Sequence, residues 1–275
     1  AFLLSIGEDV NESFNGGNCG CMIGSESYGA PPPNHYQAIY DMLVQAGIDQ
    51  SVTDRDGKSL LCGLVSVPDD FVALHKQFKF RKEVYAKALL KAAGLPKVSE
   101  AVLAACYERL TDNDDWEEPI ATACKYWNVT FLRFVVDSGV RLGQLIYNDY
   151  DTSLLQTVCG ETWDGDGIES DGLECLRLIL AYSPSIEDQK DMAKDAIQSL
   201  IGDGYFNMAK LAILCGLNIH GKDYKGETAL HSAVRQKRSD LIAMLIQRGA
   251  NLNALDKVGD SPLILAQKTM PALLD

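Results

Sequence analysis

DYKGETALHSA, at residues 223–233, and DKVGDSPLILA, at residues 256–266, are two copies of one pattern. Matching residues lie 33 positions apart, as Asp223 and Asp256 do (256 − 223 = 33). A fixed period of this length is typical of arrays whose short units cannot bury their apolar faces alone and must stack on one another. The pattern therefore predicts a repeat fold and directs the search for function to a binding surface.

The repeated stretch resembles the ankyrin repeat. Residues 223–233 fit the turn and first helix of that family, with Ala229 where proline is usual, and residues 241–253 fit its second helix and following loop. Gly226 suits a positive φ in the turn, and Thr228 can cap the first helix. The resemblance predicts an all-α, ankyrin-type helix-turn-helix solenoid with loop insertions, and it assigns a backbone-bonding role to His231 in place of a catalytic one.

Upstream, the resemblance continues with lower fidelity. Between Lys82 and Leu110 the period is lost, and we expect amphipathic helices at 84–93 and 99–110. We predict a single solenoid over residues 1–275. Its predicted units are 1–11 (end of a preceding repeat), 12–53 (divergent, with a Pro-rich loop), 54–116 (irregular), 117–148, 149–186 (with an acidic insertion), 187–222, 223–255 (the best match) and 256–275 (partial).

The incomplete units at both ends suggest a piece of a longer array. The alternative is a native chain whose half-repeats act as caps.

The amino-acid composition of the chain limits the kind of partner that we expect it to bind. The chain has 47% hydrophobic residues, a net charge of −13 and a pI near 4.7. An acidic chain disfavours nonspecific binding to nucleic acid or to anionic membranes, and it favours a protein partner with a basic or mixed-charge surface. No apolar run approaches the roughly 20 residues that span a bilayer, so we expect no direct membrane insertion.

The eight cysteines predict a reducing compartment, because five of them lie on apolar faces of expected helices and behave as small hydrophobes. We therefore expect an intracellular protein, cytoplasmic or nuclear. Cys19 and Cys21 lie in a Gly-rich stretch with only His35 nearby, which favours an irregular helix over a metal site. We predict no metal and no cofactor. No catalytic motif is present, so we predict that the chain is not an enzyme, although a Cys–His pair formed only in space stays open.

Two acidic segments, 112–118 and 160–172, each carry one tryptophan and are predicted as inserted loops. Insertions in repeat arrays map to loops on one face, which is often the binding face. Tryptophan is enriched at interaction hot spots. For Tyr126 and Trp127 we expect core packing for at least one of the pair. The predicted partner-binding residues are Trp163, Asp164 and Asp166 in the second segment, Trp116 in the first, Trp127, and, by resemblance to fingertip positions, Tyr224 and Arg55.

The function predicted from these features is protein recognition through the fingers, the concave helix faces and the inserted loops. The alternative is a substrate-recognition module of a larger multidomain enzyme or pathogen effector. A purely structural spacer is a third possibility.

Overall fold

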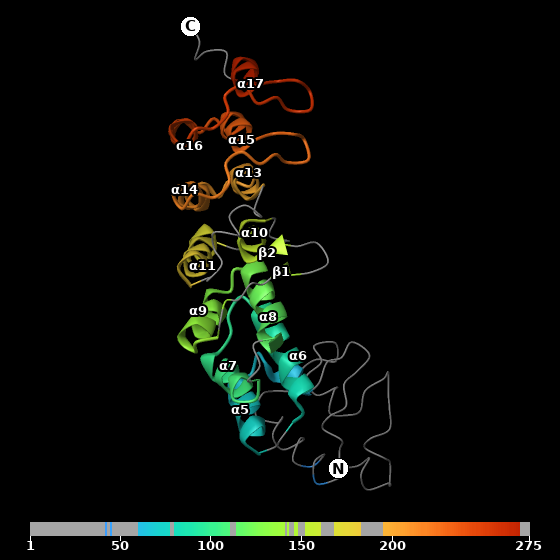
Figure 1. Ribbon diagram of the computed structural model, residues 1–275. Coiled ribbons are helices and arrows are strands. Elements are labelled where there is room, and N and C mark those ends of the chain that lie inside the picture. The colour runs from blue at the N-terminus through green and yellow to red at the C-terminus, as the bar shows by residue number, and fades with distance from the viewer. Residues whose placement is uncertain are drawn as a thin grey trace. The chain divides into compact units, whose positions relative to one another are not determined.

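The computed structural model describes Met42, Gln45 and residues 60–77, 80–110, 114–140, 142, 146–147, 152–160, 168–182 and 195–269 (Figure 1). The chain divides into two compact units, residues 1–122 and 123–275. Its described elements are helices, apart from the two-residue strands β1 (Ile146–Tyr147) and β2 (Thr152–Ser153), which pair antiparallel. The predicted all-α fold is confirmed in this part of the chain.

In the first unit, the two helices predicted where the period is lost are present. They are α6 (Lys82–Ala93) and α7 (Glu100–Tyr107). The hydroxyl of Ser99 caps α7 by accepting a hydrogen bond from the Ala101 amide at 3.3 Å. α4 (Leu60–Leu64) packs on α5 (Pro68–Gln77) and α6, and α7 packs on α5 and α6.

The acidic segment 112–118, predicted as a loop, is largely helical. Helix α8 runs over Asp114–Lys125 and contains Pro119. Its N-terminal part is anchored by Trp116, which is 1% exposed and donates its indole N–H to the carbonyl of Leu110 at 3.1 Å. Because burial of a tryptophan contributes a large apolar area, the segment folds onto the core in spite of its acidic side chains.

The second unit has two columns of helices (Figure 1). Each repeat contributes one first helix and one second helix, and each helix packs on its equivalents in the neighbouring repeats. The first helices are α10 (Leu154–Cys159), α13 (Ala196–Gly202), α15 (Ala229–Arg235) and α17 (Pro262–Thr269). The second helices are α9 (Val129–Asp137), α11 (Glu169–Tyr182), α14 (Phe206–Leu214) and α16 (Ser239–Gln247).

The 33-residue period recurs in the hydrogen bonds of the turns. Asp223 Oδ1 accepts from the amides of Lys225 and Glu227, at 2.9 and 2.7 Å. Asp256 Oδ1 accepts from the amides at the same two positions of the next turn, at 2.8 and 2.9 Å. These backbone bonds, with that from the Asp260 amide the largest, lower the pKa of Asp256. The repeated aspartate is therefore a turn-forming residue.

His231 has the structural role that the resemblance implies. Its Nδ1 accepts a hydrogen bond from the Thr228 amide at 3.1 Å, within the capping box at the start of α15. The other ring nitrogen, Nε2, then carries the proton and donates to the carbonyl of Asp260 at 3.2 Å. One side chain thus caps its own helix and binds the next repeat.

The second helices end with a common backbone pattern. Gly216 has a φ of 81° and Gly249 a φ of 83°. At each of these ends, two amides bond back to carbonyls of the last turn, as in Gly216 to Ile213 and Leu217 to Ala212. This arrangement satisfies carbonyls that the helix itself leaves without a partner, and the left-handed backbone it needs is cheapest at glycine.

The acidic insertion ends earlier than expected. The segment 160–172 was predicted as an inserted loop, whereas helix α11 already begins at Glu169. The Glu169 carboxylate accepts hydrogen bonds from the amide and side chain of Asn207, at 2.6 and 2.9 Å. Gly172 packs so closely that a Cβ there would lie 2.7 Å from both the Trp127 ring and Met208 Sδ. Contacts with the neighbouring repeats thus extend α11 at its N-terminal end.

Candidate functional site

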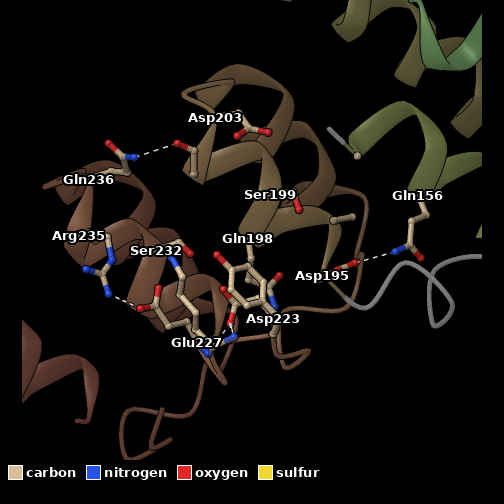
Figure 2. A pocket seen from close by; sticks show the side chains of 15 residues that line it. Gln156, Asp195, Gln198, Ser199, Asp203, Asp223, Glu227, Ser232, Arg235 and Gln236 are labelled. Atoms are coloured by element: carbon tan, nitrogen blue, oxygen red, sulfur yellow. Dashed lines mark hydrogen bonds and ion pairs between the residues drawn. The ribbon is translucent and has the colours of Figure 1, made fainter. Parts of the chain in front are cut away.

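A groove of about 610 Å³ runs across the first helices of three consecutive repeats in the second unit (Figure 2). Helix α13 lies between α10 and α15, with which it packs, and the turn before α15 reaches the rim. We call this feature the inner groove. It is lined by Gln156, Gly160, Asp195, Ala196, Gln198, Ser199, Gly202, Asp203, Asp223, Tyr224, Lys225, Glu227, Ser232, Arg235 and Gln236.

Helix α13 lines the inner groove with Ser199 and with its two cap residues, Asp195 and Asp203 (Figure 2). These residues are four apart, so they lie on one face of the helix. From the helical rise, the two carboxylates are separated by about 12 Å along the axis. The α15 residues 33 positions after Ser199 and Asp203 are Ser232 and Gln236, which line the groove as well. The groove surface is therefore polar along its length.

Internal hydrogen bonds hold these side chains in place. The Gln156 amide donates to Asp195 Oδ1 at 2.8 Å, and the Gln236 amide donates to the carbonyl of Gly202 at 3.0 Å. Both bonds join adjacent repeats. On the α15 side, Arg235 forms an ion pair with Glu227. The groove thus consists of fixed polar groups.

Tyr224 stands at the rim of the inner groove, as a fingertip position predicts. Its side chain is 77% exposed, and Lys225 Nζ lies 5.2 Å from the centre of its ring. An exposed tyrosine with a neighbouring cation can contact a partner through its apolar face and its hydroxyl. Trp163, Asp164, Asp166 and Arg55 lie outside the described residues.

Trp116 and Trp127 are buried, which corrects the partner-contact role predicted for each of them. Trp127 is 3% exposed, has a φ of 50°, and donates its indole N–H to the Val158 carbonyl at 2.9 Å. Its ring meets that of Tyr205 edge to face, with centroids 4.8 Å apart. The preceding Tyr126 is 43% exposed. Core packing by at least one of this pair is therefore confirmed.

The groove residues of α13 were not among the residues predicted from the sequence. Asp195, Ser199 and Asp203 have a four-residue spacing that does mark a helix face. However, α13 belongs to a repeat with a weak match to the pattern, and exposed polar residues are the ordinary composition of a solvated face. Alignment with Ser232 and Gln236 at the 33-residue period is the signal that could have singled them out.

His75 is buried between Tyr85 and Glu108, with Nδ1 3.0 Å from the Tyr85 hydroxyl and Nε2 2.9 Å from Glu108 Oε2. Burial raises the pKa of Tyr85, and this side chain is fully enclosed, so it is a poor nucleophile. Among the described residues, no group of three or more His, Cys, Asp or Glu side chains could hold a metal ion.

The buried thiols are weak nucleophiles. Burial raises the pKa of Cys159 and of Cys175 to about 12, and it raises the pKa of Cys124 well above its usual value. A thiol that stays protonated at neutral pH is a weak nucleophile. These cysteines therefore act as packing residues, as predicted for Cys124 and Cys175 from their apolar neighbours.

Comparison with known proteins identifies the repeats. Residues 166–269 match the family described as "Ankyrin repeats (3 copies)". This part of the chain consists of ankyrin repeats, and the resemblance seen at 223–233 and 256–266 is confirmed. Ankyrin arrays are a class of protein-binding modules whose extended surfaces contact partners.

Individual relatives cover small segments. An ankyrin repeat-containing protein of Schizosaccharomyces pombe is 32% identical over 66 residues, which is 24% of this chain and 32% of that protein. The glycerophosphocholine phosphodiesterase gde1 of the same organism is 40% identical over 70 residues, which is 25% of this chain and 6% of that protein. The chain thus matches a third or less of the length of these curated relatives.

A solved structure, the ankyrin repeat domain of Bcl-3, aligns with 95% of this chain and all of its own, at 16% identity and a TM-score of 0.47. In the described part of this chain, no helix has the length and apolarity to cross a membrane.

Proposed function

We propose that this chain recognises a partner protein through the inner groove. The observation that supports this function best is the groove itself, which is open, polar and formed by three consecutive ankyrin first helices. Repeats of this kind align equivalent positions into one long contact surface, which suits an extended or helical partner segment better than a small substrate.

The proposed partner has a basic or mixed-charge surface. The chain carries a net charge of −13, and four carboxylates line the inner groove against two cations. A negative potential of this kind attracts basic partners over several ångströms and repels nucleic acid. The charge therefore favours a protein over a polyanion as the ligand.

The rim extends the proposed contact surface. Tyr224 offers an exposed aromatic anchor beside the groove. Trp163, Asp164 and Asp166 belong to the acidic segment that follows Gly160, a groove-lining residue, and Arg55 occupies a corresponding fingertip position in the sequence. We keep these four residues as proposed secondary contacts, with the inner groove as the principal one.

Blocking the inner groove should abolish recognition. Ser199→Arg places a long side chain in the middle of the α13 face, and we expect the affinity for the physiological partner to fall by more than about tenfold, as for a central interface residue. The measurement is titration calorimetry with the purified partner. The matched control is Leu214→Arg, since Leu214 is exposed on the second helix α14. Equal loss of affinity in both variants, or loss in neither, would refute the inner groove as the binding site.

We also propose an intracellular location, in the cytoplasm or nucleus. Free thiols in and beside the helices support it: Cys106, Cys124, Cys159 and Cys175 are buried, and Cys215 is half-buried. Proteins of oxidising compartments more often pair their cysteines. Thiol titration of the protein isolated from its native source, denatured without reductant, should count eight free thiols. Two or more persistent disulfides would overturn this location.

A second candidate function is the recognition module of a larger multidomain enzyme. The match to the phosphodiesterase gde1 supports it, because that relative carries a similar segment within a much longer chain. In this case the inner groove would still bind a protein segment, and catalysis would reside elsewhere. Activity assays on the full-length protein, with and without Ser199→Arg, distinguish the two candidates.

A further inference from the structure

Several hydrogen-bond donors of the inner groove have partners within the protein. One amide N–H of Gln156 is bonded to Asp195, and one of Gln236 is bonded to the carbonyl of Gly202. Arg235 is held by Glu227. Lys225 sits over the ring of Tyr224 at the rim. What remains directed into the groove is therefore rich in acceptor oxygens.

These acceptors gather on α13. The Asp195 carboxylate accepts a hydrogen bond from a neutral amide and has no cationic partner among the described residues. Ser199 and Asp203 continue the same face towards the other end of the helix (Figure 2). A groove lined by four carboxylates and two cations is complementary to a side chain that brings both positive charge and several donors.

We propose that the partner segment inserts an arginine or lysine side chain into the inner groove against α13, with its cation on Asp195. This inference rests on the proposed function and specifies the chemistry of the occupant. The groove spans three repeats, so the segment that carries the cation runs across the first helices in an extended form, with its backbone donors facing Ser199 and Gln156.

A peptide probe tests the cation requirement without the natural partner. The probe is a capped nonapeptide of Gly, Ser and Ala with one central arginine, and its control has citrulline, which is nearly isosteric and uncharged, in the same place. Chemical shifts of the ¹⁵N-labelled 275-residue chain report where each peptide binds. We expect the arginine peptide to bind with a Kd of about 1 mM and to shift the amide resonances of α13 and the side-chain amide of Gln156.

Two matched variants locate the cation. Asp195→Asn keeps the shape of the side chain and its hydrogen bond from Gln156, and it should weaken the arginine peptide roughly threefold to fivefold, as expected for one exposed ion pair. Asp171→Asn removes the same charge from an exposed position on α11 and should leave the affinity unchanged. Raising the salt concentration should weaken the arginine peptide and not the citrulline peptide.

Equal binding of the arginine and citrulline peptides, an equal effect of the two variants, or absence of shifts in α13 at millimolar arginine peptide would each overturn the cation site. None of these results would by itself refute the inner groove as a protein-binding site. That function is tested separately, by the effect of Ser199→Arg on the affinity for the natural partner. Conversely, a groove that binds the arginine peptide while Ser199→Arg leaves the partner's affinity unchanged would support the cation site and contradict the proposed function.

Discussion

Leu230→Asp should lower the free energy of unfolding by about 4 kcal/mol or more, the range reached when an unpaired charge is buried in a core. Leu230 is 2% exposed on α15, and this helix is packed between α13 and α17 and against α16. Urea denaturation, monitored by circular dichroism, measures the change in the free energy of unfolding.

The control for this variant is Leu263→Asp. Leu263 is the equivalent residue one repeat later, yet it is 61% exposed. We expect a loss below about 0.5 kcal/mol, as for an ordinary surface substitution. Burial raises the pKa of a carboxyl group, so the loss for Leu230→Asp relative to wild type should be largest above neutral pH and shrink as the pH falls. Similar losses in both variants would refute the assigned inter-repeat core.

Trp127→Ala should destabilise the second unit by about 3–5 kcal/mol, the usual cost of truncating a buried aromatic side chain. The variant removes the indole N–H bond to Val158 and the ring contact with Tyr205, so it cuts links to two later repeats. Tyr126→Ala is the matched control, because the neighbouring Tyr126 is much more exposed and should cost far less. Equal unfolding free energies for the two variants would contradict the assignment of Trp127 to the core.

Trp127 packs against Gly172, so a substitution at Gly172 tests the same contact from its other side. Gly172→Ala adds a methyl group 2.7 Å from the indole, and overpacking of this kind costs about 1–3 kcal/mol. Gly202→Ala, at a helical glycine with no atom within 4 Å of the added carbon, should be neutral or mildly stabilising. If Gly172→Ala is made in the Trp127→Ala background, most of its cost should vanish.

The sequence was sufficient to predict the features that depend on local chemistry repeated at a fixed period. The aspartate turns, the Thr228–His231 cap and the glycines with positive φ follow from residue types whose local preferences match their observed geometry. Two copies in one register made these assignments secure. The helices of the irregular region were predicted from apolar periodicity alone, and their ends differ by at most three residues from those observed.

The environment of single aromatic residues was harder to predict. Trp116 and Trp127 lie among polar or acidic residues in the sequence, where a tryptophan can be either an exposed anchor or a core residue. Which applies depends on contacts with other segments, such as the approach of Gly172 and Tyr205 to Trp127. Leu230 and Leu263 occupy equivalent positions in the repeat. Leu230 is nevertheless buried and Leu263 exposed, because their neighbours differ.

The candidate site was only partly predictable for the same reason. Tyr224 was identified because fingertip exposure is a property of the turn itself. The inner groove requires α10, α13 and α15 to lie side by side, and residues 156 and 195 come together only through that packing. The polar groups of α13 therefore gained a functional interpretation once their neighbours were known.

Site-specific photo-crosslinking tests the central claim most directly. A benzophenone side chain placed at Ser199 in the full chain should crosslink to the partner in cells, and mass spectrometry should map the crosslinked partner peptide to a segment that contains an arginine or lysine. The same group at Leu214, on the exposed side of α14, should yield no crosslink to that protein. A partner captured equally from both positions, or from Leu214 alone, would contradict recognition through the inner groove.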